Sequence, residues 1–188
     1  MRFIGIDPAT RTGFVALDID GNILEQIELQ GKGPTVTGGI SIEKLVSLEN
    51  KLFQQLQQQD EILIEQPAMG TQKGVTTGMI HGGLRTMIHR KGMTFNEINP
   101  TSTKKYVAVT GWTGEVGSKR RLKDKEKKAA VAAAAKELFG FTHKSDNVTD
   151  AYIIARAAVN LYRMREYMPL LDTEPYQVEV INSILNKD

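Results

Sequence analysis

Two short apolar segments that each end in an acidic residue constrain the fold of this chain more than any other feature. Residues 2–7 end at Asp7, residues 62–65 end at Glu65, and both segments are typical of buried strands. Between them, apolar residues recur at helical spacing over residues 40–58. A strand, a helix and a second strand form a crossover connection, which makes the two strands parallel neighbours. The sequence therefore predicts that Asp7 and Glu65 lie side by side at the ends of adjacent strands.

The remaining segments predict an α/β fold. Residues 14–19 and 23–29 read as strands separated by a tight turn, so together with residues 2–7 they form an antiparallel meander. A short strand is expected over residues 94–98, and Pro100 then opens a loop. Three more helices are expected, over residues 75–90, 124–139 and 148–164. These elements make a mixed five-stranded sheet flanked by helices.

Length and composition fit a protein with one main domain. The chain has 188 residues, of which 40% are hydrophobic and 24% are charged, so it can bury a core without cross-links. Cysteine is absent, which excludes disulfides, thiolate zinc sites and cysteine nucleophiles. No apolar run is long enough for a signal peptide or a membrane span, so we expect a soluble, cytoplasmic protein with no membrane partner. Residues 1–165 are expected to form the main domain, and residues 166–188 a C-terminal extension that packs as a helix.

Positive charge is concentrated in one segment. The net charge of the whole chain is only +2, whereas residues 119–128 contain seven Lys or Arg and two acidic residues, a local charge of 7 − 2 = +5. Such a block on a nearly neutral protein indicates a phosphate-binding surface. Taken alone, it is equally compatible with the solvated start of a charged helix.

Acidic residues also gather at the start of the helix expected over residues 148–164. Asp146 and Asp150, or Asn147 and Asp150, are spaced so that they share one face of a helix and could both face the two strand acids. Ser145 or Asp146 could instead cap the helix. Asp150 lies within the first turns, where capping does not account for it.

Asp7, Glu65 and Asp150 together predict a metal site. Neighbouring buried carboxylates are costly unless a cation compensates them. Oxygen ligands with no His or Cys nearby favour Mg²⁺ or Mn²⁺ over zinc. Two such ions can activate water and stabilise the leaving oxygen in phosphodiester hydrolysis. The acids and the basic segment therefore predict a metal-dependent nuclease.

Four segments resemble motifs of the RuvC-type Holliday junction resolvases. They are residues 4–13 (IGIDPATRTG), residues 62–66 (ILIEQ), residues 99–106 (NPTSTKKY) followed by Gly111, and residues 147–151 (NVTDA). The likeness spans about residues 2–160. It implies a ribonuclease H-like fold and the activity of a crossover junction endodeoxyribonuclease, a hydrolase that makes paired nicks in branched double-stranded DNA. A phage-type member of the family would work in the cytoplasm of the host.

The same resemblance implies a homodimer and a Mg²⁺ cofactor. Mn²⁺ is expected to substitute for Mg²⁺, with two ions in each active site. Gly78, Gly82 and Gly83 lie in the region that makes a close dimer contact in the family.

Carried over by position, Asp7, Glu65 and Asp150 are the catalytic metal ligands. The family usually has an acid or a His three residues before the last Asp, but this chain has Asn147 there and Asp146 one residue earlier. We take Asp146 as the fourth catalytic residue and metal ligand. Asn147, which can coordinate through its carbonyl oxygen, is the alternative.

Six basic residues are expected to bind DNA. Lys104 and Lys105 match a segment that contacts phosphate in the family, and Lys125 falls where the family commonly places a functional lysine. Three others lie in or beside a loop that is longer here than usual: Lys119, Arg120 and Arg121. Trp112, in the same loop, could stack on a base or anchor the loop.

Three other functions are alternatives, and the first of them uses the same residues, so the sequence does not separate it from a junction resolvase. A broader structure-selective nuclease would act on forks and flaps as well as on four-way junctions. An actin-like phosphotransferase also begins with a strand, an Asp and a turn, but the second Gly-rich phosphate motif expected there is missing. A catalytically silent DNA-binding module would not need Asp7, Glu65 and Asp150 together.

Overall fold

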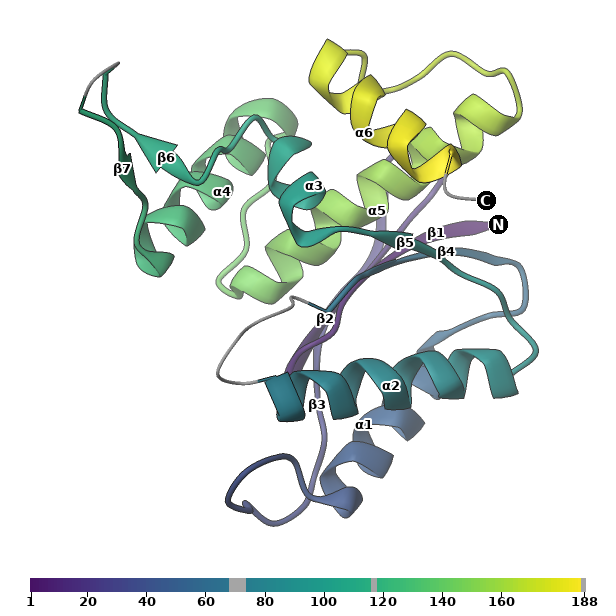
Figure 1. The fold of residues 1–188 in the computed structure, drawn as a ribbon. Helices are drawn as coiled ribbons and strands as arrows, with labels where there is room; N and C mark the ends of the chain where they lie inside the picture. The colour runs from purple at the N-terminus through teal and green to yellow at the C-terminus, as the bar shows by residue number, and fades with distance from the viewer. Residues whose placement is uncertain (68–73, 116–117, 187–188) are drawn as a thin grey trace.

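The computed structural model describes residues 1–67, 74–115 and 118–186 and shows a central sheet with helices on both faces (Figure 1). The strands are β1 (Arg2–Asp7), β2 (Arg11–Leu17), β3 (Ile23–Gln30), β4 (Asp60–Glu65) and β5 (Asn96–Ile98). Their order in the sheet is β3-β2-β1-β4-β5. β1 and β2 are antiparallel, as are β2 and β3, whereas β4 is parallel to both β1 and β5. The mixed five-stranded sheet and the parallel crossover are thus confirmed.

Helices form a layer on each side of this sheet. They are α1 (Ile42–Gln55), α2 (Gly74–Arg90), α3 (Pro100–Lys105), α4 (Asp124–Phe139), α5 (Asp146–Arg165) and α6 (Pro175–Leu185). Figure 1 shows α1 and α2 on one face and α5 on the other, with α3, α4 and α6 around α5. No helix in the part of the chain that the structure describes is long and apolar enough to cross a membrane.

The loop expected after Pro100 is wrong, because residues 100–105 form the short helix α3. The Asn99 side chain caps this helix by accepting a hydrogen bond from the Thr101 amide at 2.8 Å. Pro100 occupies the first turn, where its missing N–H has no intrahelical partner to lose. An Asn-Pro pair is therefore a helix start here.

Strand alternation assigns the side chains to the two helical layers. In β1, Phe3 packs in the core cluster that includes α5, whereas Ile4 and Ile6 pack in the cluster that includes α1 and α2. Because successive side chains point to opposite faces, Asp7 lies on the α5 face. Leu63 packs on the same face, so Glu65 follows it there.

Two glycines allow α5 to lie directly against the strands. A Cβ atom at Gly5 of β1 would lie only 2.0 Å from the carbonyl oxygen of Ala151. A Cβ atom at Gly13 of β2 would lie 1.9 Å from the carbonyl oxygen of Asn147. The first two turns of α5 therefore rest on bare backbone, which brings Asp150 close to the end of β1.

A buried polar network joins α3, α5 and the C-terminal segment. The Tyr106 hydroxyl donates to Asp172 at 2.8 Å, and the Asn160 amide donates to both residues, at 2.7 Å to Tyr106 and 2.8 Å to Asp172. Arg156 forms an ion pair with Asp172. Beyond it, α6 packs on α3 and α5. The expected C-terminal helix is present, residues 187–188 lie outside the described residues, and a domain boundary at residue 165 stays a prediction.

The long loop before α4 contains a short β-hairpin. Strands β6 (Trp112–Thr113) and β7 (Arg120–Arg121) pair antiparallel, and the Leu122 amide donates to the Gly111 carbonyl at 2.9 Å. Residues 116–117 lie outside the described residues. Figure 1 shows the hairpin projecting beyond α4, away from the central sheet.

Candidate active site

The ends of β1 and β4 bring Asp7 and Glu65 together. Ile6 is paired with Ile64 in the parallel ladder, so the next residue on each strand is an acid. Asp7 is buried, with 8% of its surface exposed. Glu65 shares a hydrogen bond with Asp7 and accepts another from the Thr103 hydroxyl of α3 at 3.0 Å. This is the arrangement expected from the crossover.

Asp150 joins the two strand acids from the second turn of α5. Burial raises the pKa of Asp7 well above its ordinary range, and the charges of Glu65 and Asp150 raise it further. Burial likewise raises the pKa of Glu65 to about 7 and that of Asp150 to about 6. Three carboxyl groups thus share a poorly hydrated space in which full ionisation is unfavourable.

Lys104 and Lys128 supply the positive charge around this cluster. The ammonium of Lys104 lowers the pKa values of all three acids, and that of Lys128 lowers those of Asp7 and Asp150. Lys104 was expected at the DNA surface, but the structure places it beside the carboxylates. Lys128 was not singled out from the sequence.

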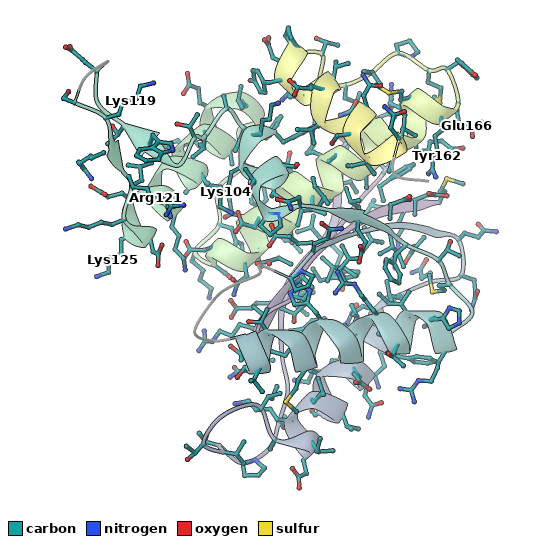
Figure 2. The ribbon with its side chains drawn as sticks, viewed as in Figure 1. Lys104, Lys119, Arg121, Lys125, Tyr162 and Glu166 are labelled. Carbon is teal, nitrogen blue, oxygen red and sulfur yellow. The ribbon has the colours of Figure 1, made fainter. Side chains whose placement is uncertain are left out.

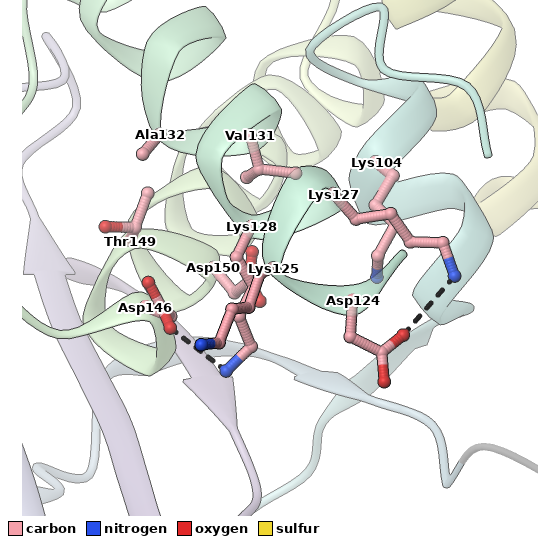
Figure 3. A pocket seen from close by; sticks show the side chains of 10 residues that line it. All are labelled: Lys104, Asp124, Lys125, Lys127, Lys128, Val131, Ala132, Asp146, Thr149 and Asp150. Carbon is pink, nitrogen blue, oxygen red and sulfur yellow. Dashed lines mark ion pairs between the residues drawn. The ribbon is translucent and has the colours of Figure 1, made fainter. Parts of the chain in front are cut away.

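Asp146 and Asn147 face different partners. A carboxylate oxygen of Asp146 lies 3.0 Å from Nζ of Lys128, and its charge raises the pKa of Asp150 (Figure 3). The Asn147 amide instead donates to the Arg11 carbonyl at 2.6 Å. Ser145 caps α5, accepting a hydrogen bond from the Val148 amide, so neither residue is needed as the cap.

A pocket of about 510 Å³ opens beside the acids (Figure 3). Its lining comes from α3, α4 and α5: Lys104, Asp124, Lys125, Lys127, Lys128, Val131, Ala132, Asp146, Thr149 and Asp150. Four of these side chains are lysines and three are aspartates. Lys127 and Lys128 pair with Asp124 and Asp146, which leaves Lys104 and Lys125 to bind an anion such as a phosphate group. Asp146 and Asp150 line it, which places both on the side from which such a group would approach.

The donor chemistry of the cluster fits a hard divalent cation. Its side chains offer only carboxylate oxygens, and burial raises the pKa values of Asp7, Glu65 and Asp150, so a bound cation would compensate charges that are costly to bury. Among the residues that the structure describes, however, no three His, Asp or Glu side chains are arranged to hold a metal ion as they stand. Asp7 and Glu65 instead share a hydrogen bond.

Polar side chains of α2 also contact the end of β4, from the face opposite α5. Arg85 of α2 donates to the Glu65 carbonyl at 3.3 Å and forms an ion pair with Glu97 at 2.7 Å. His81 is buried beside it, with its ring nitrogen 3.1 Å from the guanidinium, and burial lowers its pKa to about 4. His81 is thus packed beside the strand that carries Glu65.

Sequence reasoning missed Thr103, Lys128 and Arg85. For Lys128 a signal was present: it lies three residues before Val131, whose spacing to Ala135 marks the buried face of α4. Thr103 was hidden because α3 was taken for a loop. Nothing in the local sequence marks Arg85 as the partner of a strand carbonyl.

The expected DNA-binding residues fall into two groups. Lys105 forms an ion pair with Glu179 of α6, and Arg120 is bound by both carboxylate oxygens of Glu126, at 2.9 and 2.7 Å. The others, Lys119, Arg121 and Lys125, have no carboxylate partner within the described part of the chain, and Lys104 faces the acids. Figure 2 shows Lys119, Arg121 and Lys125 together at the end of the molecule formed by the hairpin and the start of α4.

No protein-family model and no curated protein sequence matches this chain. Solved structures of RuvC do match it. RuvC from Thermus thermophilus is 16% identical with a TM-score of 0.59, and the match covers 89% of this chain and 98% of that one. T. thermophilus RuvC in complex with a Holliday junction substrate is 16% identical with a TM-score of 0.61, covering 88% and 96%. The chain therefore has a RuvC-type, ribonuclease H-like fold, as the sequence predicted.

Proposed function

We propose that this protein is a metal-dependent endonuclease that hydrolyses phosphodiester bonds in branched DNA, with four-way junctions as its main substrate. One observation carries the proposal: Asp7, Glu65 and Asp150 meet from three separate elements beside a lysine-lined pocket. The fold supports it, since a RuvC of the same architecture has been solved in complex with a Holliday junction substrate.

Asp7, Glu65 and Asp150 would hold Mg²⁺ or Mn²⁺, two ions in each site, with Asp146 as the fourth ligand and Asn147 as the alternative. When bound, such ions activate water and stabilise the leaving oxygen. Carboxylates bind metal ions in their deprotonated form, so Asp7, Glu65 and Asp150 would hold these ions more tightly as the pH rises through the pKa of Glu65, about 7.

Other side chains of the site position the reacting groups. Thr103 orients Glu65 through the hydrogen bond to its carboxylate. Lys104 and Lys128 keep the acids closer to their ionised forms, and they offer ammonium groups to the phosphates that flank the scissile bond. The remaining pocket lysines extend this positive surface away from the acids.

The DNA path follows from which cations are available. Lys119, Arg121 and Lys125 can bind phosphate directly, whereas Lys105 and Arg120 must first exchange Glu179 and Glu126 for it. Exposed ion pairs are weak, so replacing these carboxylates by phosphate costs little free energy. Binding that uses several of these residues will weaken steeply with salt.

A homodimer would place two such sites on two symmetry-related strands. The surface for it is an apolar stripe on α1 formed by Ile42, Val46 and Phe53, which are 63%, 45% and 46% exposed. These residues share one side of the helix at spacings of four and seven. The stripe flanks α2, since Lys91 at the end of that helix lies 3.9 Å from the centre of the Phe53 ring. Gly82 of α2 leaves open space where a Cβ atom would stand.

The test is cleavage of synthetic four-way junctions, forks, flaps and linear duplex by purified protein with Mg²⁺, beside Asp7→Asn. We expect paired nicks in the four-way junction, none in the linear duplex, and none with the variant or with EDTA. Equal cleavage of forks and flaps would support the broader structure-selective nuclease. No cleavage of any substrate with Mg²⁺ or Mn²⁺ would overturn the proposal.

A further inference from the structure

A second pocket lies at the base of the β6–β7 hairpin, and we call it the hairpin pocket. It measures about 780 Å³ and lies between the hairpin and α3. Lys104 and Lys127 line both this pocket and the one beside the acids. The two hollows are therefore neighbours separated by shared lysines, so one DNA strand could occupy both.

The hairpin pocket combines an aromatic ring, cations and an apolar lining. Trp112 contributes an indole that is 54% exposed, and Val109 contributes an apolar side chain. Arg121 contributes a guanidinium with no carboxylate partner among the described residues. Among the residues that the structure describes, no acidic side chain lines the pocket. An exposed indole beside unpaired positive charge is not explained by packing of the fold.

Hairpin geometry places the indole and the guanidinium on one side. Trp112 and Arg121 are directly paired across the two strands, so their side chains project from the same face of the hairpin. The backbone of Trp112 is held by Thr110, whose hydroxyl donates to the Trp112 carbonyl at 3.0 Å. The pair is therefore presented by a paired hairpin.

We propose that the hairpin pocket binds one unpaired nucleotide of the branched DNA, with its base stacked on Trp112 and its phosphate bound by Arg121 and Lys105. This inference rests on the proposed function and names the substrate feature that the site selects. Bases inside a duplex have both faces covered by their neighbours, so an indole stacks only on an unpaired or terminal base. A branch point is where such bases occur, and the shared lysines then lead the strand toward the acids.

Trp112 is the only tryptophan of the chain, so intrinsic tryptophan fluorescence reports on the hairpin pocket alone. Wild-type protein in EDTA, which prevents cleavage, is titrated with a blunt duplex, a fork with unpaired arms, and the same fork with abasic arms. We expect the fork to quench the indole at least about twofold more than the duplex, because stacking requires an exposed base face. The abasic fork should quench no more than the duplex. Equal quenching by all three DNAs would overturn the proposal.

Affinity measured by anisotropy of labelled DNA supplies the second readout. Trp112→Ala should weaken fork binding roughly tenfold, in line with the loss of one stacked base, and leave duplex binding unchanged. Lys119→Ala is the matched control, because Lys119 lies close to Arg121 in the sequence but does not line the hairpin pocket. This substitution should weaken the binding of fork and duplex equally. Far-UV circular dichroism checks that each variant is folded. Unchanged fork affinity in a folded Trp112→Ala protein would overturn the proposal.

These readouts separate this inference from the nuclease proposal. A protein that binds forks with strong quenching but cleaves nothing would keep the hairpin pocket and lose the nuclease. Cleavage of branched DNA, with no fork-specific quenching and no effect of Trp112→Ala, would keep the nuclease and reject the hairpin pocket.

Discussion

The two faces of the sheet bury different chemistry although they share the same strands. Under α1 and α2 lies an aliphatic layer to which β1 and β4 contribute Ile4, Ile6 and Ile64. Under α5 the same strands contribute Phe3 and Leu63 and then end in acids. One step along a strand moves a side chain from one face to the other. The face under α1 and α2 is therefore lined by aliphatic side chains of these strands and stabilises the fold. The face under α5 is apolar along most of its length and carries buried carboxyl groups where β1 and β4 end.

The largest effect is expected from Glu65→Gln, compared with Glu61→Gln on the same strand and face. If Glu65 is a metal ligand as proposed, its loss removes several kcal/mol of transition-state stabilisation, so junction cleavage should fall on the order of 10³-fold or more. Glu61 lies at the other end of β4 in an ion pair with Arg165 and should be dispensable. Single-turnover rates on a four-way junction measure this. An equal loss of cleavage rate in both variants would show that cleavage does not depend specifically on the acid at the end of β4.

The next largest effect is expected on stability, from adding a methyl group at Gly5, where β1 contacts α5. Gly5→Ala would drive a methyl group into the Ala151 carbonyl, 2.0 Å away, and should lower the free energy of unfolding by about 3 kcal/mol or more. Gly82 of α2 is exposed, so Gly82→Ala meets nothing within 4 Å and should stay within about 1 kcal/mol of the wild type. Urea denaturation measures both. Similar values would mean that the contact between β1 and α5 tolerates an added methyl group.

A smaller effect is expected from pH on the metal-free protein. The folded pKa values of Glu65 (about 7) and Asp150 (about 6) exceed their ordinary values of 4.5 and 3.8, so the folded state binds more protons. Their contribution to stability is therefore complete at low pH and is lost as the pH rises through about 6 to 7. Between pH 5 and pH 8 the loss should be on the order of a few kcal/mol.

Thermal denaturation across this pH range, with and without Mg²⁺, checks that prediction. Mg²⁺ should stabilise the protein most at pH 8, where the acids are ionised, and should flatten the profile. Glu65→Gln removes one of the groups with a raised pKa and should reduce the slope. A metal-free protein that gained stability from pH 5 to pH 8 would contradict the shared burial of these acids.

The smallest effect on the fold is expected from Val46→Glu, which tests the outer surface of the layer formed by α1 and α2. A charge in the apolar stripe of α1 should yield monomers while leaving the monomer's unfolding free energy within about 0.5 kcal/mol. Gln54→Glu, exposed on another side of α1, is the matched control and should remain dimeric. Analytical ultracentrifugation gives the oligomeric state. A dimeric Val46→Glu protein would place the interface elsewhere.

The sheet and the meeting of three acids were predictable because they follow from local rules. Alternation in β1 and β4, together with a crossover helix, is enough to set Asp7 beside Glu65. Helical periodicity then places Asp150 on α5. These inferences need only residues close in sequence and one handedness rule.

The surroundings of the acids were not predictable in the same way, because they depend on how separate elements meet. Lys104 faces the acids only because α3 is a helix, and a turn would have directed it elsewhere. The pairing of Lys105 with Glu179 joins positions 74 residues apart, since 179 − 105 = 74. Which cations are available for phosphate is thus a property of the packed structure, and composition shows only how many exist.

The polar network around Asp172 connects the C-terminal segment to the helix that lies beside the acids. Tyr106 closes α3, the helix that carries Thr103 and Lys104, and it is tied to Asn160 and Asp172. A chain truncated after residue 165 would lose Asp172, so the Tyr106 hydroxyl would lack its acceptor and the C-terminal end of α3 would lose this contact. The C-terminal segment therefore holds α3 in place. Through α3 it fixes the positions of the Thr103 hydroxyl and the Lys104 ammonium beside the acids, although Asp7 itself comes from the N-terminal strand.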